Sequence, residues 1–268
     1  MTIDYRLAWE IVDRFRRLVP YEAYYLKDEV EMDRVGPLVP ETSDVLRRGF
    51  AQSSRVLDVG CGDGRTLLGN AALFNYAMGI DESDYVIARA LRARDATGIR
   101  HVEFRQAKAV ELPFADDAFD MVFSERGPLG HSDVTLKEAL RVLEPGGLIF
   151  VETLGDYETL GVERRRSEKH GVRLQTLLAR TSTLVFRDLY EFLKYQCSTL
   201  VYQGRELPPE TERAWLEAML SQAVDANGRI IIPHETIWIA GSKVTFRPSP
   251  PTSASRAPRP AAWADLRA

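Results

Sequence analysis

The sequence has few cysteines, no long apolar run and little net charge. Its 268 residues include only two cysteines, Cys61 and Cys197, so we expect free thiols in a reducing cytoplasm rather than a disulfide framework. No apolar run approaches the roughly 20 residues of a membrane span. The first residues lack the basic start and the apolar stretch of a signal peptide. These absences predict a soluble, cytoplasmic protein without a membrane partner.

Metal ligands and extended basic regions are scarce as well. The four histidines and the two cysteines show no ligand spacing, which argues against a metal site. The net charge of −4 provides no bulk attraction for nucleic acid. The short basic run at residues 164–166 is interpreted as a solvated face or as a contact for an anionic substrate. We expect a small-molecule substrate; RNA or protein remains an alternative, and the oligomeric state is not predicted.

Length and composition favour one α/β domain with additions. Hydrophobic residues make up 45% of the chain and charged residues 28%, as in globular proteins. Residues 3–18 have apolar side chains at helical spacing and predict an N-terminal helix, followed by an aromatic cluster. We predict a helical cap over residues 1–50, which either packs on the main domain or acts as a lid. The main domain is expected over residues 51–243, and a proline-rich, disordered tail over residues 244–268.

The chain is organised around a strand that runs into a glycine-rich turn. Residues 56–59 predict a short buried strand, Gly60, Gly62 and Gly64 follow it, and a helical pattern comes next. This order is typical of the nucleotide-binding edge of a doubly wound α/β sheet. Glycine allows a positive φ and a close approach of ligand to backbone. The spacing G-x-G-x-G differs from the G-x-G-x-x-G of dinucleotide-binding folds, which argues against a nicotinamide-dependent oxidoreductase.

An acidic residue closes the next predicted strand. Residues 76–80 are mostly apolar and Asp81 follows them, with Glu82 directly behind. A carboxylate at the tip of the second strand can accept two hydrogen bonds from a ribose diol. The alternative is a capping role for the helix that opens at Ser83 and Asp84. Glu82 is a second candidate for the ribose contact.

Further strands are predicted along the rest of the chain. They are expected at residues 102–106, 119–124, 148–152, 172–186, 230–232 and 236–240. Pro233 lacks a backbone N–H and therefore suggests a bulge or an edge between the last two. Residues 143–147, Leu-Glu-Pro-Gly-Gly, form a turn before the strand at 148–152.

Four elements in this order resemble the class I S-adenosylmethionine (SAM) methyltransferases, in particular small-molecule enzymes with a type 11 methyltransferase domain. They are the Asp-x-Gly-x-Gly-x-Gly run from Asp58, the acid at Asp81, the Phe-Asp-x-Val-x-Ser strand at residues 119–124, and the Pro-Gly-Gly turn at residues 145–147. The resemblance implies a Rossmann-like methyltransferase fold: a doubly wound, seven-stranded, mostly parallel sheet with an antiparallel edge and an N-terminal helical cap. The implied activity is SAM-dependent methyl transfer.

The resemblance also implies which residues contact the cofactor SAM. They are Asp58, Gly60, Cys61, Gly62, Gly64, Asp81, Glu82, Lys108, Ala109 and Ser124. Lys108 departs from the family pattern, which has an acid there to accept a hydrogen bond from the adenine amino group. Because lysine only donates, adenine recognition is expected from backbone groups of Lys108 and Ala109 or from another side chain.

The methyl acceptor is expected near the end of the fourth strand, where Glu125 and Arg126 are candidate contacts to substrate or cofactor. The nucleophile is an oxygen or a nitrogen. His131, a few residues further on, is either a general base or a solvated, structural histidine. A non-catalytic SAM-binding partner protein is the alternative function, and Lys108 favours it. A nucleotide-dependent oxidoreductase is the other alternative.

Overall fold

The computed structural model describes residues 4–25, 30, 32–35, 42–130, 132–155, 158–202, 204–209, 213–221 and 229–244. The candidate base His131 and the predicted disordered tail, from residue 245 on, lie outside the described residues.

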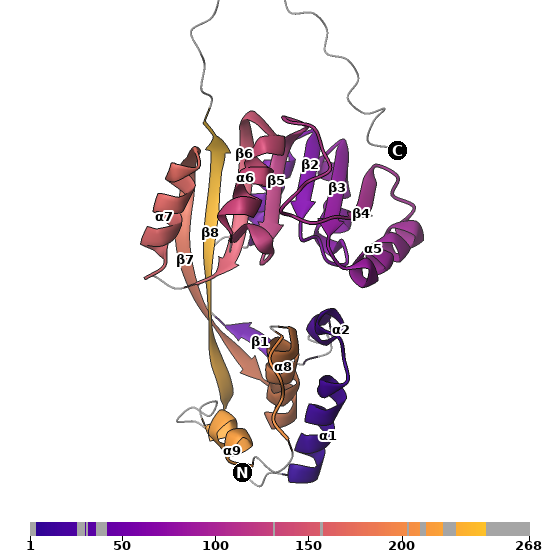
Figure 1. Ribbon diagram of the computed structural model, residues 1–268, viewed down its shortest axis with the longest axis vertical. Coiled ribbons are helices and arrows are strands. Elements are labelled where there is room, and N and C mark those ends of the chain that lie inside the picture. Colours follow the sequence, from indigo (N-terminus) through magenta and orange to yellow (C-terminus); the bar gives the residue numbers. More distant parts are fainter. Residues whose placement is uncertain are drawn as a thin grey trace, which may run out of the picture. The chain divides into compact units, whose positions relative to one another are not determined.

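The described chain alternates helices with strands, as labelled in Figure 1. The α-helices are α1 (Tyr5–Arg16), α2 (Pro20–Tyr25), α3 (Thr42–Phe50), α4 (Arg65–Gly69), α5 (Asp84–Thr97), α6 (Asp133–Val142), α7 (Leu160–Lys169), α8 (Leu189–Tyr202) and α9 (Arg213–Ser221). Short 3-10 helices are η2 (Ala71–Leu73) and η3 (Pro128–Gly130). The strands are β1 (Met32–Val35), β2 (Arg55–Val59), β3 (Tyr76–Asp81), β4 (Val102–Gln106), β5 (Phe119–Glu125), β6 (Leu143–Leu154), β7 (Val172–Phe186) and β8 (Ile230–Lys243).

The strands form one mixed, mostly parallel sheet in the order β1-β7-β8-β6-β5-β2-β3-β4. From β2 the chain builds outward through β3 and β4 and then returns to the other side of β2 with β5 and β6. The strands of this central part are parallel, and β8 pairs antiparallel with β6. The direction of build-up therefore reverses between β2 and β5. In open α/β sheets, ligands bind at the carboxyl ends of the strands beside such a reversal.

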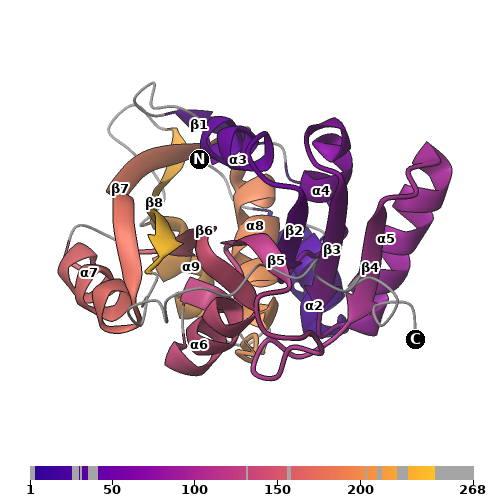
Figure 2. The ribbon, with the colours of Figure 1, turned by 90° about the horizontal axis from the view of Figure 1, so that it is seen from above.

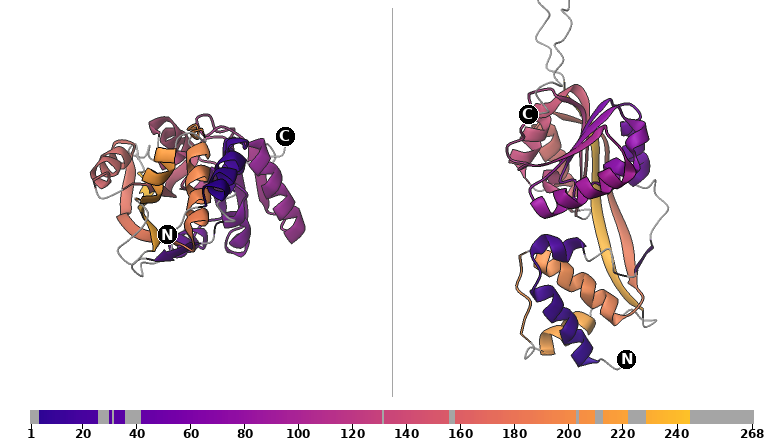
Figure 3. Two further views of the ribbon diagram at one scale, coloured as in Figure 1. Left: turned by 90° about the horizontal axis from the view of Figure 1, so that it is seen from below. Right: turned by 90° about the vertical axis from the view of Figure 1, so that its right-hand side faces the viewer.

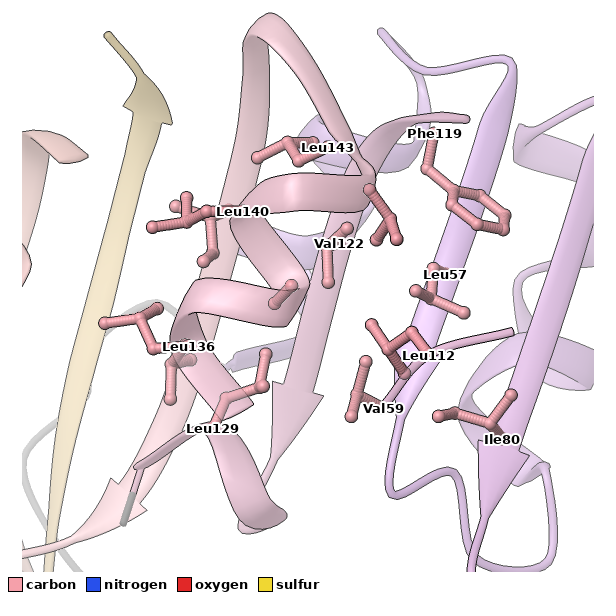
Figure 4. Close-up of a cluster of buried hydrophobic side chains, with 14 of the residues drawn as sticks. Leu57, Val59, Ile80, Leu112, Phe119, Val122, Leu129, Leu136, Leu140 and Leu143 are labelled. Atoms are coloured by element: carbon pink, nitrogen blue, oxygen red, sulfur yellow. The ribbon is translucent and has the colours of Figure 1, made fainter. Parts of the chain in front are cut away.

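Helices cover both faces of this central sheet. Leu57 of β2 and Val122 of β5 point toward α6, whose Leu136 and Leu140 complete one apolar cluster (Figure 4). Alternate residues of the same strands line the other face, where they pack with Phe50 of α3 and with α4 and α5. Figure 2 shows α3 and α4 on the opposite side of the strands from α6. Burial of both faces explains the almost continuous apolar character of these strands.

The chain folds into two compact units. The first comprises Met1–Leu38 and Thr181–His234, and the second comprises Val39–Arg180 and Glu235–Ala268. Strands β7 and β8 each contribute residues to both units. The domain boundaries predicted at residues 50 and 243 stay a prediction; the compact units are divided at other points and group residues 181–234 with the N-terminal helices.

The first unit is built on paired helices. The predicted N-terminal helix is present as α1, which lies beside α8 (Figure 3). Its buried stripe, including Trp9, Val12 and Phe15, packs with Phe192 and Leu193 of α8. Asp4 caps the helix by accepting a hydrogen bond from Leu7 N at 3.2 Å. Among the described helices, none is both long and apolar enough to cross a membrane.

The predicted sheet is confirmed, with two refinements. The eight strand segments predicted from the sequence correspond to the seven strands from β2 to β8, and β1 adds an eighth, antiparallel strand on β7 from Met32 opposite Phe186 to Val35 opposite Thr183. The two strands predicted around Pro233 are one continuous strand, β8. Because pairing with β6 runs only from Thr236 onward, Pro233 breaks no hydrogen bond to β6.

Candidate functional site

The predicted glycine turn joins β2 to α4 at the carboxyl end of the sheet. Gly60, Gly62 and Gly64 have φ values of +84°, +55° and +76°, which favour glycine over every other residue. The N–H groups of Gly60 and Cys61 donate to the Ile80 carbonyl at 2.8 and 2.9 Å. These two bonds tie the start of the turn to the neighbouring strand β3.

The turn is also closely packed against neighbouring side chains. A Cβ on Gly60 would lie 2.8 Å from Cδ of Pro128, and a Cβ on Gly64 would overlap the ring of Phe104 on β4. The turn thus needs glycine for its backbone conformation and for its surroundings. Cys61 is buried, and burial raises the pKa of its thiol well above the ordinary value, so the side chain stays a neutral thiol. Cys197 is buried as well, and both cysteines are free thiols, as predicted.

Asp81 lies against the glycine turn, at the tip of β3, where the sequence predicts an acid. Its Oδ2 accepts a hydrogen bond from Gly62 N at 3.1 Å, and its Oδ1 accepts one from Ser83 N at 3.0 Å. The residue is only 8% exposed. A carboxylate offers about four lone-pair positions, so two remain for further donors. The bond from Ser83 N also fits the alternative capping role, and one carboxylate can serve both roles.

Asp58 is a buried carboxylate without a neutralising partner among the described residues. It is 3% exposed, and no hydrogen bond from the described residues reaches its side chain. Burial raises its pKa well above the ordinary value, and the negative charges of Glu125 and Asp81 raise it further. A buried charge without a partner is costly. The position is therefore suited to a cationic ligand group.

The other predicted cofactor residues follow β3 and β4. The amide of Gln106 donates to the Glu82 carbonyl at 3.0 Å, and Ala107 N donates to the Asp81 carbonyl at 2.9 Å. These bonds hold the loop after β4 beside the tip of β3. Lys108 is exposed in this loop, and Ala109 is half-buried. The structure thus brings them to the same edge of the sheet as Asp81.

Ser124 has a different environment from the other predicted cofactor residues. Its side chain is fully buried, and its hydroxyl donates to the Val59 carbonyl at 2.7 Å. A Cβ on Gly127 would lie 2.7 Å from the same carbonyl oxygen. Ser124 and Gly127 therefore lock the tip of β5 against β2. A contact between the Ser124 side chain and a cofactor stays a prediction.

Glu125 connects the tip of β5 to the helix after the glycine turn. Its Oε2 accepts a hydrogen bond from the Thr66 hydroxyl at 2.7 Å. Burial raises the pKa of Glu125, and the nearby Glu152 carboxylate adds to the increase. Arg126 follows with a φ of +55°, rare for a residue with a side chain, and its N–H donates to the Glu152 carbonyl at 2.7 Å. Such strained backbone is concentrated at functional sites.

The buried carboxylates Asp58 and Asp81 and the half-buried Glu125 predict an unusual pH profile for the ligand-free protein. Asp58, Asp81 and Glu125 all have raised pKa values, so the folded state binds their protons more tightly than the unfolded state. Their stabilising contribution is complete below the unfolded values near pH 4 and is lost as pH rises through the raised values. We expect the melting temperature to increase when pH is lowered from 8 to about 5, measured by differential scanning fluorimetry.

A pair of variants isolates the cause of this profile. Asp58→Asn removes the most strongly shifted carboxyl and should flatten the profile between pH 8 and 5. Asp95→Asn, on the exposed surface of α5, should keep the slope of the wild type. A wild-type melting temperature that falls over the same interval would contradict the prediction. Below pH 4 stability should decrease, because Arg65 lowers the pKa of Asp63 and Arg141 lowers that of Glu138.

Comparison with known proteins agrees with this arrangement. Residues 56–147 match a family model described as a methyltransferase domain. This range begins in β2, includes the glycine turn, Asp81 and the tip of β5, and ends at Gly147; the turn predicted at residues 143–147 is the first part of β6 in the structure. Residues 56–147 are therefore similar to methyltransferase domains. The resemblance that the sequence motifs carry is thereby confirmed.

Relatives and solved structures extend the comparison. An uncharacterized protein of Haemophilus influenzae is 30% identical over 133 residues, which are 46% of this chain and 53% of the relative. The uncharacterized methyltransferase YcgJ of Bacillus subtilis is 34% identical over 95 residues, 35% of this chain and 38% of YcgJ. The chain thus spans about half the length of the first relative and less of the second.

The structural likeness covers more of the chain. The crystal structure of YcgJ has a TM-score of 0.58 at 18% identity and covers 76% of this chain and 98% of YcgJ. A functionally unknown protein from Deinococcus radiodurans has a TM-score of 0.60 at 16% identity and covers 83% of this chain and 97% of that protein. At such identities the likeness shows the shared fold alone.

The chain is held in place on both sides of position 131, the candidate base. Residue 131 itself lies outside the described residues. Arg166 of α7 donates to the carbonyl oxygens of Leu129 and Ser132 at 2.7 and 2.5 Å and pairs with Asp133 at 3.0 Å. Within the predicted basic run, Arg166 therefore has a structural role rather than a solvated one. The assignment of His131 as a base stays a prediction.

Sequence reasoning missed three residues that lie beyond the matched range 56–147. Glu152 of β6, Trp238 of β8 and Arg180 of β7 lie close to one another although they are far apart in the chain. No motif marks them, and only strand pairing brings them to Glu125. Among the described residues, no group of three or more His, Cys, Asp or Glu side chains could hold a metal ion.

Proposed function

We propose that this protein transfers a methyl group from SAM to an oxygen or nitrogen nucleophile of a small molecule. The observation that carries the proposal is the hydrogen bond from Gly62 N to Asp81 Oδ2, which joins the glycine turn to the acid at the tip of β3. Both predicted cofactor contacts therefore lie at one edge of the sheet, beside the reversal between β2 and β5. The methyltransferase domain over residues 56–147 supports the reaction class.

The residues at this edge fit the nucleoside part of SAM. Asp81 has two lone-pair positions left after its bonds to Gly62 and Ser83, which suits the two hydroxyls of a ribose. Glu82 is the second candidate for this contact. Lys108 and Ala109 follow β4 on the same side, and we assign adenine recognition to their backbone groups because the lysine side chain offers no acceptor.

The buried negative charge fits the remainder of the cofactor. SAM carries a positive sulfonium and a positive amino group. Asp58 has no hydrogen bond from the described residues, and Glu125 lies close enough to raise its pKa. A cation that binds between the turn and the tip of β5 offsets this repulsion. When bound, the sulfonium supplies an electrophilic methyl group that a lone pair can displace.

The protein's contribution to catalysis is then mainly positioning. Alignment of a nucleophile with the methyl group can lower a barrier by several kcal/mol, up to about 10. A hydroxyl or amine nucleophile also needs a base. His131 and the carboxylates at the tips of β5 and β6 are the candidates. A structural neighbour from Aquifex aeolicus is described as a SAM dependent methyltransferase and has a TM-score of 0.50 at 13% identity. At this identity the two proteins share only the fold, so the neighbour supports SAM as the methyl donor only through that fold.

Isothermal titration calorimetry with SAM, S-adenosylhomocysteine and NAD⁺ tests the donor. We expect binding of the two adenosyl sulfur compounds and none of NAD⁺, since the glycine spacing is not that of a dinucleotide site. Binding of NAD⁺ alone would overturn the proposal in favour of an oxidoreductase. If SAM binds and extracts incubated with labelled SAM yield no methylated product, the alternative that Lys108 favours, a non-catalytic SAM-binding partner, replaces it. Labelled RNA or protein would revise only the acceptor.

A further inference from the structure

A row of polar side chains crosses the sheet beyond the predicted cofactor residues. Glu125 of β5 lies opposite Glu152 of β6, and Glu152 lies opposite Trp238 of β8. Residues paired in this way project from the same face of a sheet. The guanidinium of Arg180 lies 5.4 Å from the centroid of the Trp238 ring. We call Glu125, Glu152, Trp238 and Arg180 the polar row.

In the described part of the chain, several polar groups of the row lack a hydrogen-bond partner although they are buried or nearly buried. Glu152 is 5% exposed, and its carboxylate receives no hydrogen bond from the described residues. Trp238 is 2% exposed, and its Nε1–H has no acceptor; Nε of Arg180 is likewise buried and unpaired in the described part of the chain. Folded proteins satisfy nearly all buried polar groups, so several such groups in one row need an explanation. A bound ligand that pairs with all of them provides one.

The polar row begins beside the glycine turn. It extends away from the part of the sheet where we expect the nucleoside of SAM to bind. Glu125 accepts a hydrogen bond from Thr66, two residues after Gly64. Asp81 and Lys108, at the tips of β3 and β4, lie on the other side of β2 in the sheet order. A donor bound as proposed above therefore has its adenosine on the β3 side and its sulfur near β2 and β5. The acceptor then faces β6 and β8.

The chemistry of the row specifies the kind of acceptor. The buried carboxylate of Glu152 and the half-buried carboxylate of Glu125, on neighbouring strands, favour a cationic group between them. The N–H groups of Arg180 and Trp238 at the other end require an acceptor oxygen. We propose that the polar row binds the methyl acceptor, and that this acceptor is a small amino acid whose amine is methylated. This inference rests on the proposed function and names its substrate class.

Glu152 takes a proton from the ammonium group of the acceptor, which frees the nitrogen lone pair. That lone pair forms a bond to the methyl carbon, and the C–S bond breaks with its electron pair remaining on sulfur. The products are a methylated ammonium, a neutral thioether and a protonated Glu152, which returns its proton to solvent.

The first test needs no acceptor. Glu152→Gln removes one of two facing negative charges, so a ligand-binding role predicts a higher melting temperature for the ligand-free protein. Loss of a structural contact would lower it instead, and a lower melting temperature overturns the inference. Glu103→Gln, at the other end of the sheet on β4, is the matched control and should leave the melting temperature unchanged.

The second test measures ligand preference. Protein saturated with S-adenosylhomocysteine is titrated with glycine, β-alanine and alanine and with their hydroxy-acid counterparts, glycolate, 3-hydroxypropionate and lactate. We expect at least one amino acid to bind ten times more tightly than its hydroxy acid, and Glu152→Gln to abolish that preference. Trp238→Phe should weaken both members of the pair.

The outcomes separate the acceptor from the donor. Equal or better binding of the hydroxy acids, or no binding of any amino acid, overturns the inference while the proposed function stands. Glu152→Gln should keep the affinity for S-adenosylhomocysteine within twofold, since the residue is placed on the acceptor side. If the wild type fails to bind S-adenosylhomocysteine, the proposed function fails, and the inference fails with it.

Discussion

Asp81→Ala should weaken SAM binding by about 100-fold or more. We expect Asp81 to accept two hydrogen bonds from the ribose, and a bond to a charged group contributes about 1.5–3 kcal/mol. A loss of about 3 kcal/mol corresponds to roughly 100-fold in affinity. The substitution also removes the acceptor that holds Gly62 N, so the turn itself loses a restraint. Calorimetric titration with SAM measures the effect.

The control is another aspartate close in sequence. Asp84 is exposed at the start of α5, and Asp84→Ala should change SAM affinity less than threefold. Circular dichroism and thermal unfolding establish that Asp81→Ala is folded. Unchanged SAM affinity in folded Asp81→Ala would refute the placement of the ribose and, with it, the orientation on which the acceptor site depends.

Gly64→Ala should destabilise the protein by about 3 kcal/mol or more. The left-handed backbone conformation costs a residue with a Cβ about 1–2 kcal/mol. The added methyl group would also overlap the ring of Phe104, and overpacking adds about 1–3 kcal/mol. Because Gly64 closes the turn, we also expect SAM affinity to fall more than tenfold. Urea unfolding gives the free energy, and calorimetry gives the affinity.

Gly98 provides a matched control for the backbone contribution. Its φ is +71°, against +76° for Gly64, but a Cβ there meets nothing within 4 Å. Gly98→Ala should therefore cost only about 1–2 kcal/mol and leave SAM binding intact. Equal losses in the two variants would show that Phe104 does not constrain the turn. Phe104→Leu combined with Gly64→Ala should recover part of the stability, because the smaller side chain relieves the overlap.

Hydrogen bonds from Arg141 hold the loop after β4 in place beside the candidate site. Arg141 of α6 donates to the carbonyl oxygens of Phe114 and Leu112 at 2.8 and 2.9 Å and pairs with Glu138 at 2.9 Å. Glu138 in turn accepts from Leu112 N at 2.9 Å. The loop that follows β4 is thus fixed to α6 through its backbone. The anchor of this loop, Arg141, is a helix residue that no motif in the loop indicates.

Local sequence was sufficient to predict the strand, turn and helix at residues 55–69 and the acid at Asp81. Glycine is favoured where φ is positive, and an apolar run of four or five residues fits a buried strand, so neighbours in the chain determine both features. The order of the motifs was sufficient to predict the fold, including the reversed direction of sheet build-up between β2 and β5. The added strand β1 and the continuity of β8 through Pro233 were not predictable, because both depend on which partner strand lies alongside.

The sequence alone thus determined that this chain has a methyltransferase fold with a glycine turn beside an acid, because those features depend on short local stretches of the chain. Only the tertiary structure decided that Glu152, Trp238 and Arg180 lie in one row with Glu125. Their proximity comes from the pairing of strands that are separated by long stretches of chain, and a buried polar side chain has no local pattern. The physical reason is that backbone conformation follows from neighbouring residues, whereas burial and charge pairing follow from the whole sheet.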